Sequence, residues 1–203
     1  MVEVLKQGGI MVIPIIGVAV LALYLVFYRW FDLRQLRRKS VNITPLIDLL
    51  EQGDYDTVRE RLMAVSGTFG NLLRIGLIAK KLSPAQLENR LRQVYFEEIG
   101  CVHSYLTLIQ LIASVLPMLG LLGTVTGMIT VFKVIAVSGV GNAQALSGGI
   151  SEALITTQLG LALSIPVLFG HRWVSGYADG IDLEMKRIVT AIMQLNKGAD
   201  HVG

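Results

Sequence analysis

Three long stretches without charged side chains constrain the fold of this chain more than any other feature. Residues 7–28, 99–132 and 153–171 contain no Asp, Glu, Lys or Arg. A helix needs about 20 apolar residues to cross the hydrocarbon core of a bilayer, and each stretch meets that length. Over the whole chain, 16% of the residues are charged, compared with about 25% in a soluble domain. We therefore predict an all-α integral membrane protein with three transmembrane helices and exclude an ordinary soluble enzyme.

The basic residues predict how these helices are oriented. Few charges precede the first stretch, whereas five basic residues follow it, namely Arg29, Arg34, Arg37, Arg38 and Lys39. The loop at 138–147 carries no charge, and basic residues return at Arg172, Lys186 and Arg187. Because Lys and Arg concentrate on the cytoplasmic side of a membrane, we predict the N-terminus outside and the C-terminus inside.

These patterns give boundaries for each segment. We predict an outer N-terminus at 1–9, transmembrane helices at 10–28, 106–136 and 150–171, an outer loop at 137–149, a cytoplasmic helical domain at 29–105 and a cytoplasmic C-terminal helix at 172–203. The first helix is expected to be retained, because it is longer than a signal-peptide core and no A-x-A-like site precedes the basic cluster.

The cytoplasmic segments show helix signals. Residues 45–65 have helical spacing that is interrupted at Gly53-Asp54, which predicts a turn with Asp54 as the next N-cap. Ser83-Pro84-Ala85-Gln86 combines a capping box with proline at the first helical position. Since no proline follows until Pro117, we expect one long helix to run from there into the membrane.

The sequence has no catalytic, metal or cofactor motif. Its three histidines, His103, His171 and His201, are too scattered for a metal motif, and no nucleophile elbow, P-loop or dinucleotide fingerprint occurs. A single Cys101 cannot form an internal disulfide. We expect a protein that is not an enzyme and holds no metal or cofactor.

Small and hydroxyl residues form two stripes along the predicted second and third transmembrane helices. On a helical wheel, Pro117, Gly120, Thr124 and Gly127 share one face, and Ala153, Thr157, Gly160 and Ser164 share another. Gly123 and Gly127 also form a G-x-x-x-G motif, which allows membrane helices to approach closely. The stripes therefore predict close helix packing at Gly120, Gly123, Gly127 and Gly160, or a hydrated pathway between helices.

Glu152 is the acidic residue that stands alone beside the apolar stretches. An acid near a membrane span is costly and usually faces protein or water, which favours a functional role. Alternatively, Glu152 lies at the outer end of its helix, where the helix dipole accommodates a carboxylate. On an ideal helix it lies about 140° from Thr157, and Thr156 is nearer to it. A distortion or a neighbouring subunit would be needed to bring all three together.

Two motifs carry a family resemblance. PMLGLLGTVTG at 117–127, followed by SEALITTQLGL at 151–161 and Ile165-Pro166, is similar to the MotA/TolQ/ExbB proton-channel family, and most similar to its ExbB branch. The resemblance implies a bacterial inner-membrane motor subunit, with the outer segments in the periplasm. It also implies a homo-pentamer around an ExbD-like single-span partner with an intramembrane Asp. Such a complex would use the proton-motive force to energise a TonB-like protein and outer-membrane transport.

The same resemblance assigns pore residues. It implies a proton pathway through Glu152, Thr124 and Thr157. The helical wheel adds Thr156 and Ser164 as secondary residues. Because membrane topology explains the basic residues, we expect no nucleic-acid partner. Two alternatives stay open. One is a TolQ-like subunit of the Tol-Pal envelope system, or another stator-type motor, in the same fold. The other is a non-conducting membrane scaffold in which Glu152 is merely interfacial.

Overall fold

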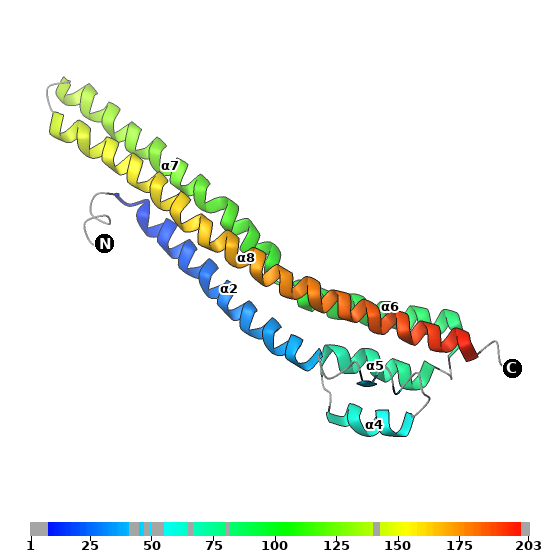
Figure 1. The fold of residues 1–203 in the computed structure, drawn as a ribbon. Coiled ribbons are helices and arrows are strands. Elements are labelled where there is room, and N and C mark those ends of the chain that lie inside the picture. The colour runs from blue at the N-terminus through cyan, green and yellow to red at the C-terminus, as the bar shows by residue number, and fades with distance from the viewer. Residues whose placement is uncertain are drawn as a thin grey trace. The chain divides into compact units, whose positions relative to one another are not determined.

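The computed structural model describes residues 8–40, 45–46, 49, 55–64, 67–79, 82–139 and 143–199. Throughout these ranges the regular secondary structure is helical, without a strand. The helices are α2 (Val12–Ser40), α4 (Tyr55–Ala64), α5 (Thr68–Ile78), α6 (Pro84–His103), α7 (Leu106–Ser138) and α8 (Ala143–Ala199) (Figure 1). The predicted all-α class is thus confirmed, whereas the turn expected at Gly53-Asp54 lies outside the described residues.

Among the described residues, three helical segments are long and apolar enough to cross a membrane. They lie within Val12–Arg38, Pro84–Ser138 and Leu146–Gln194. Their number agrees with the three transmembrane helices predicted from the uncharged stretches. The first and third of these helices extend past their own uncharged stretches. Helix α2 ends at Ser40, and α8 ends at Ala199.

The chain forms two compact units. The first unit comprises residues 1–29 and 105–174, and the second comprises residues 30–104 and 175–203. Helices α2 and α8 contribute residues to both units, α7 belongs to the first, and α4, α5 and α6 belong to the second.

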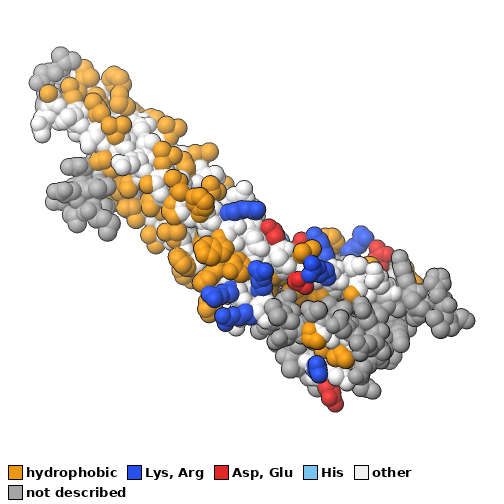
Figure 2. Space-filling model, in the orientation of Figure 1, with side chains coloured by type: hydrophobic (Ala, Val, Ile, Leu, Met, Phe, Trp, Pro, Cys, Tyr) orange, Lys and Arg blue, Asp and Glu red, His pale blue; other side chains and the backbone are white. Residues whose placement is uncertain are grey.

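In the first unit, α7 and α8 lie side by side (Figure 1). Val12, Ile15, Ala19, Ala22 and Val26 are buried along α2 at the three-to-four-residue spacing of one helix face. Large apolar side chains are nevertheless exposed, and hydrophobic side chains cover much of the visible face over this unit (Figure 2). A soluble monomer does not expose so much apolar surface, so a bilayer or further subunits must cover it.

In the second unit, α5 packs against both α4 and α6. Its core contains Phe69 and Leu72 of α5, Leu87 and Leu91 of α6, and Ile181 of α8. The predicted capping box at the start of α6 is confirmed. Gln86 N–H donates to Ser83 Oγ at 3.4 Å, and Ser83 N–H donates to Gln86 Oε1 at 3.1 Å.

A polar cluster also joins α6 to α8 in this unit. The Tyr95 hydroxyl donates to Asp182 Oδ1 at 2.6 Å, and Lys186 Nζ donates to Asp182 Oδ2 at 2.8 Å.

The expected single helix from residue 84 into the membrane is wrong. It is interrupted at Ser104 and Tyr105, where the chain passes from the second unit to the first. Ser104 adopts an extended ψ of 145°, and its hydroxyl donates to Cys101 O at 2.8 Å. Tyr105 is left-handed, with φ 64°, which costs a non-glycine residue about 1–2 kcal/mol. Pro117 lies inside α7 without ending it.

Candidate functional site

The small residues of α7 and α8 meet at a close backbone contact within the first unit. A Cβ added to Gly160 would lie 2.7 Å from Leu116 O and 2.9 Å from Gly120 Cα. One added to Gly127 would lie 2.8 Å from Gly149 O. Because these neighbours are backbone atoms, no side-chain rotation could make room. We call the facing residues Gly120, Gly123 and Gly127 of α7 and Gly149, Ala153, Thr156 and Gly160 of α8 the α7–α8 seam.

Thr156 is the fully buried hydroxyl residue of the α7–α8 seam. Its side chain has 0% exposure and lies against Gly123, where an added Cβ would overlap the Thr156 Cβ and Oγ1 atoms. The Oγ1 atom is 2.9 Å from Ala153 O and 3.1 Å from Glu152 O. Its hydrogen bonds therefore stay within α8, while its methyl and Cβ fill the space that Gly123 leaves.

Thr157, the next residue, bonds across the two helices. Its Oγ1 donates to Gly120 O of α7 at 3.2 Å and is 3.3 Å from Ala153 O of its own helix. The side chain is partly exposed. Thr157 is thus a hydroxyl that links α7 to α8 and also reaches the surface of the unit.

Glu152 lies one turn before these threonines and is partly exposed. Its carboxylate contacts Gly9, because a Cβ added to Gly9 would overlap the Glu152 carboxylate. Gly9 has φ +63°, a conformation that glycine adopts readily. Within the described part of the chain, the Glu152 carboxylate forms neither a hydrogen bond nor an ion pair.

The remaining predicted residues bond locally. Thr124 is partly exposed and donates to Leu121 O of its own helix at 2.7 Å. Ser164 is 9% exposed and donates to Leu161 O at 2.8 Å. The structure thus brings Thr156, Thr157 and Gly160 to α7, brings Glu152 to Gly9, and leaves the Thr124 hydroxyl bonded within α7.

Two residues at this site were not selected from the sequence. Gly9 contacts the Glu152 carboxylate, and Gly149 faces the Gly127 backbone and Val131. Each follows another glycine, in Gly8-Gly9 and Gly148-Gly149. A glycine pair at the end of a predicted span is the one signal that could have drawn attention to them.

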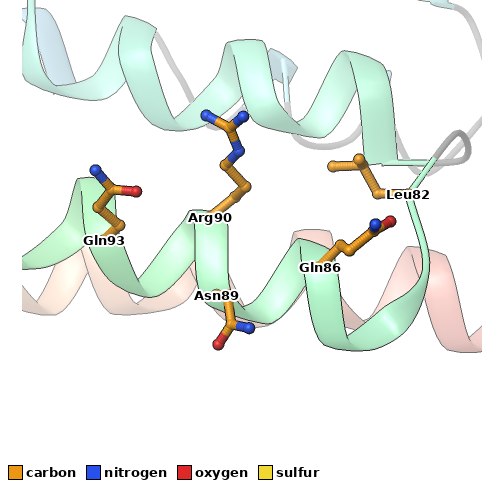
Figure 3. Close-up of a pocket in the computed structure, with 5 residues that line it drawn as sticks. All are labelled: Leu82, Gln86, Asn89, Arg90 and Gln93. Atoms are coloured by element: carbon orange, nitrogen blue, oxygen red, sulfur yellow. The ribbon is translucent and has the colours of Figure 1, made fainter.

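Other side-chain groupings offer less chemistry. In the ranges that the structure covers, no cluster of three His, Cys, Asp or Glu residues could hold a metal ion. A polar hollow of about 300 Å³ in the second unit is lined by Leu82, Gln86, Asn89, Arg90 and Gln93. Figure 3 shows Arg90 and Asn89 extending in opposite directions from α6, so the hollow does not gather its polar groups around one point.

These features define a multi-pass helical membrane protein with a closely packed helix pair and one unpaired carboxylate beside it. A model of the MotA/TolQ/ExbB proton channel family matches residues 60–187, which include α5, α6, α7 and the α7–α8 seam. The chain therefore belongs to the MotA/TolQ/ExbB proton channel family, as its motifs predicted.

Curated relatives agree with the ExbB branch. The chain is 27% identical to ExbB-like protein 3 of Synechocystis, named as a biopolymer transport protein, over 79% of this chain and 78% of the relative. It is 31% identical to ExbB-like protein 1 of the same organism, over 82% of this chain and 67% of the relative. The Tol-Pal system protein TolQ of Haemophilus influenzae is 32% identical over a shorter segment, 42% of this chain and 37% of the relative.

Proposed function

We propose that this chain is the channel-forming subunit of an inner-membrane motor that uses the proton-motive force to energise a TonB-like protein. The proposal rests on one observation: the Glu152 carboxylate forms no hydrogen bond or ion pair with a described residue. Glu152 immediately precedes Ala153 of the α7–α8 seam, in a member of a proton channel family. A carboxylate placed in this way can accept a proton from one side of a membrane and release it to the other.

The chemistry of one acid also supports a partner. Glu152 is the single acidic residue between residues 99 and 178, and the hydroxyls of Thr124, Thr156 and Thr157 relay protons only through water. A second titratable group would complete the pathway, and an intramembrane Asp of an ExbD-like single-span subunit would supply it. The membrane potential provides about 2.3 kcal/mol per charge for each 100 mV, so a few protons could drive a conformational step.

Within this proposal, the segments keep their predicted placement. Residues 1–9 and 137–149 face the periplasm, residues 29–105 and 172–203 lie in the cytoplasm, and five subunits surround the partner helices. Glu152, Thr124 and Thr157 line the proton pathway, and Thr156 and Ser164 are secondary to them. The exposed apolar side chains of the first unit support such assembly in a bilayer.

A TolQ-like role in the Tol-Pal system is the second candidate, and the similarity to Haemophilus TolQ favours it. The two functions differ in their partner. Co-purification from the native membrane with a TonB-like or a TolA-like protein distinguishes them.

The test of the proton pathway is Glu152→Gln. This change keeps the shape of the side chain but removes its titratable proton. We expect energised uptake of an iron–siderophore complex to be lost, with protein level and oligomer size unchanged. The matched control is Glu184→Gln, which lies on the same helix and removes only an exposed ion pair with Arg187. Wild-type uptake by Glu152→Gln at a matched protein level would refute the proposal.

A further inference from the structure

We infer that the C-terminal part of α2 binds the headgroup of an anionic phospholipid through Arg34, Arg37 and Arg38. This inference is independent of the proton pathway, because all three residues lie in the second unit, away from Glu152 in the chain. We call the three arginines, with Trp30 of α2 and Tyr177 of α8, the arginine collar.

Among the residues that the structure describes, none forms an ion pair with the arginines of the collar. All three side chains are exposed. The ion pairs between described residues are Arg92–Glu88, Lys186–Asp182 and Arg187–Glu184. Arg34, Arg37 and Arg38 thus form neither an ion pair nor a hydrogen bond with any residue that the structure describes. Three neighbouring cations without counter-charge create a positive potential that attracts an anion.

Two of the guanidinium groups are held in place by aromatic rings. The Arg34 Cζ atom lies 4.9 Å from the centroid of the Trp30 ring, and the Arg37 Cζ atom lies 5.3 Å from that of Tyr177. Stacking uses the face of a guanidinium and leaves its N–H edge free. Arginine binds phosphate through that edge, with two parallel hydrogen bonds. The stacked side chains are therefore partly ordered for a phosphate before it arrives.

The direction of these side chains favours a ligand in the membrane interface. Side chains on a helix lean toward its N-terminus, and Arg34 does so, since it covers the ring of Trp30 four residues earlier. The N-terminal part of α2 is the apolar stretch, so the Arg34 side chain leans toward it.

The neighbouring apolar surface selects the class of ligand. Phe31 is 68% exposed and lies three residues before Arg34 on α2, which places an apolar ring beside the cations. An acidic peptide would satisfy the charges alone, whereas an anionic phospholipid satisfies both the charges and the exposed ring. Basic side chains at the cytoplasmic end of a transmembrane helix are where anionic lipids bind. We therefore assign the collar to a phospholipid with a net negative headgroup.

The test uses the full-length protein in nanodiscs of phosphatidylcholine with a fixed fraction of phosphatidylglycerol. Native mass spectrometry of the released protein counts the retained lipids of each kind. We expect the wild-type protein to retain phosphatidylglycerol over phosphatidylcholine. Each arginine near an anionic surface contributes a factor of about five in affinity, so R34Q/R37Q/R38Q should lose most of this selectivity.

Two control variants distinguish a specific lipid-binding site from a general effect of positive charge. The variant R61Q/R74Q/R90Q removes the same charge from exposed positions on α4, α5 and α6 and should keep the selectivity. The variant W30L/Y177L keeps every charge but removes the stacking rings, and should lower the selectivity severalfold. Equal retention of both lipids by the wild-type protein would overturn the assignment. So would equal losses of phosphatidylglycerol selectivity in R34Q/R37Q/R38Q and R61Q/R74Q/R90Q. If R34Q/R37Q/R38Q kept the phosphatidylglycerol selectivity of the wild-type protein, the collar would not be the lipid site, and an acidic protein segment would remain as its ligand.

Discussion

Adding one methyl group at Gly123 tests the geometry of the α7–α8 seam. The Cβ of an alanine at this position would overlap the Cβ and Oγ1 atoms of Thr156. Thr156 has 0% exposure and cannot move aside, so the two helices must separate. Overpacking of this kind costs about 1–3 kcal/mol, and the better helix propensity of alanine returns about 1 kcal/mol. We expect Gly123→Ala to lower the free energy of unfolding by about 1 kcal/mol.

A double-mutant cycle identifies the contact responsible. Because the overlap includes the Thr156 Cβ atom, Thr156→Ala leaves the obstacle in place, whereas Thr156→Gly removes it. Gly123→Ala should therefore be tolerated in a Thr156→Gly background, with a coupling of about 1–2 kcal/mol, and remain destabilising in a Thr156→Ala background. The assay is reversible unfolding in mixed detergent–SDS micelles, followed by circular dichroism.

Gly17→Ala provides the control within a transmembrane helix. No atom lies within 4 Å of a Cβ added to Gly17, so this change should leave the protein as stable as wild type or slightly more stable. If Gly123→Ala and Gly17→Ala proved equally stable, α7 and α8 would not approach as closely as the structure shows, and the reasoning would fail.

Substitutions at Gly9, Thr157 and Asp182 probe the rest of the molecule. Gly9→Ala introduces a Cβ that overlaps the Glu152 carboxylate at a positive φ, so it should reduce energised uptake at unchanged protein level, and wild-type uptake would show that this contact is dispensable. Thr157→Ser keeps the hydroxyl that reaches Gly120 O and should retain uptake, whereas Thr157→Val should reduce it more than Thr156→Ala does. For Asp182, burial raises the pKa, but hydrogen bonds from Lys186 and Tyr95 outweigh burial and hold the pKa below 3.8. The carboxylate therefore stabilises the folded state above that pH, and the stability is lost as pH falls through the folded-state pKa. The acid limb of the unfolding free energy, measured by denaturant titration, should be shallower in Asp182→Asn.

Local patterns were sufficient to predict most of the fold. A long uncharged stretch indicates a transmembrane helix, because the free energy of transferring a segment into a bilayer depends on its composition rather than on tertiary contacts. The capping box at Ser83 and Gln86 involves residues three positions apart, so it too can be identified from the sequence alone. Gly120, Gly123, Gly127 and Gly160 follow helical spacing, and this spacing predicted either close helix packing or a hydrated pathway between the helices.

Features that depend on tertiary contacts were missed. Tyr105 takes the left-handed conformation that ends α6, yet neither glycine nor proline marks the position. The contact between Gly9 and Glu152 joins residues from opposite ends of the first unit's sequence, and helical spacing carries no information about it. An ideal wheel also separates Thr156 from Thr157, whereas both contact α7. Close approach of two glycine-lined backbones brings adjacent residues of one helix within reach of the other.

Proton movement along the proposed pathway would require energy to break hydrogen bonds of the site. The Thr157 hydroxyl is bonded to Gly120 O, and Thr124 and Thr156 are bonded to carbonyls of their own helices. A hydroxyl must release such a bond before it can donate to a water beside Glu152, at a net cost of about 1 kcal/mol. A proton that crosses 100 mV provides about 2.3 kcal/mol, which exceeds this cost. Because the Thr157 bond also joins α7 to α8, its release would loosen the α7–α8 seam. Protonation at Glu152 and movement between the two helices would then be coupled through Thr157, which gives a proton channel a route to mechanical work.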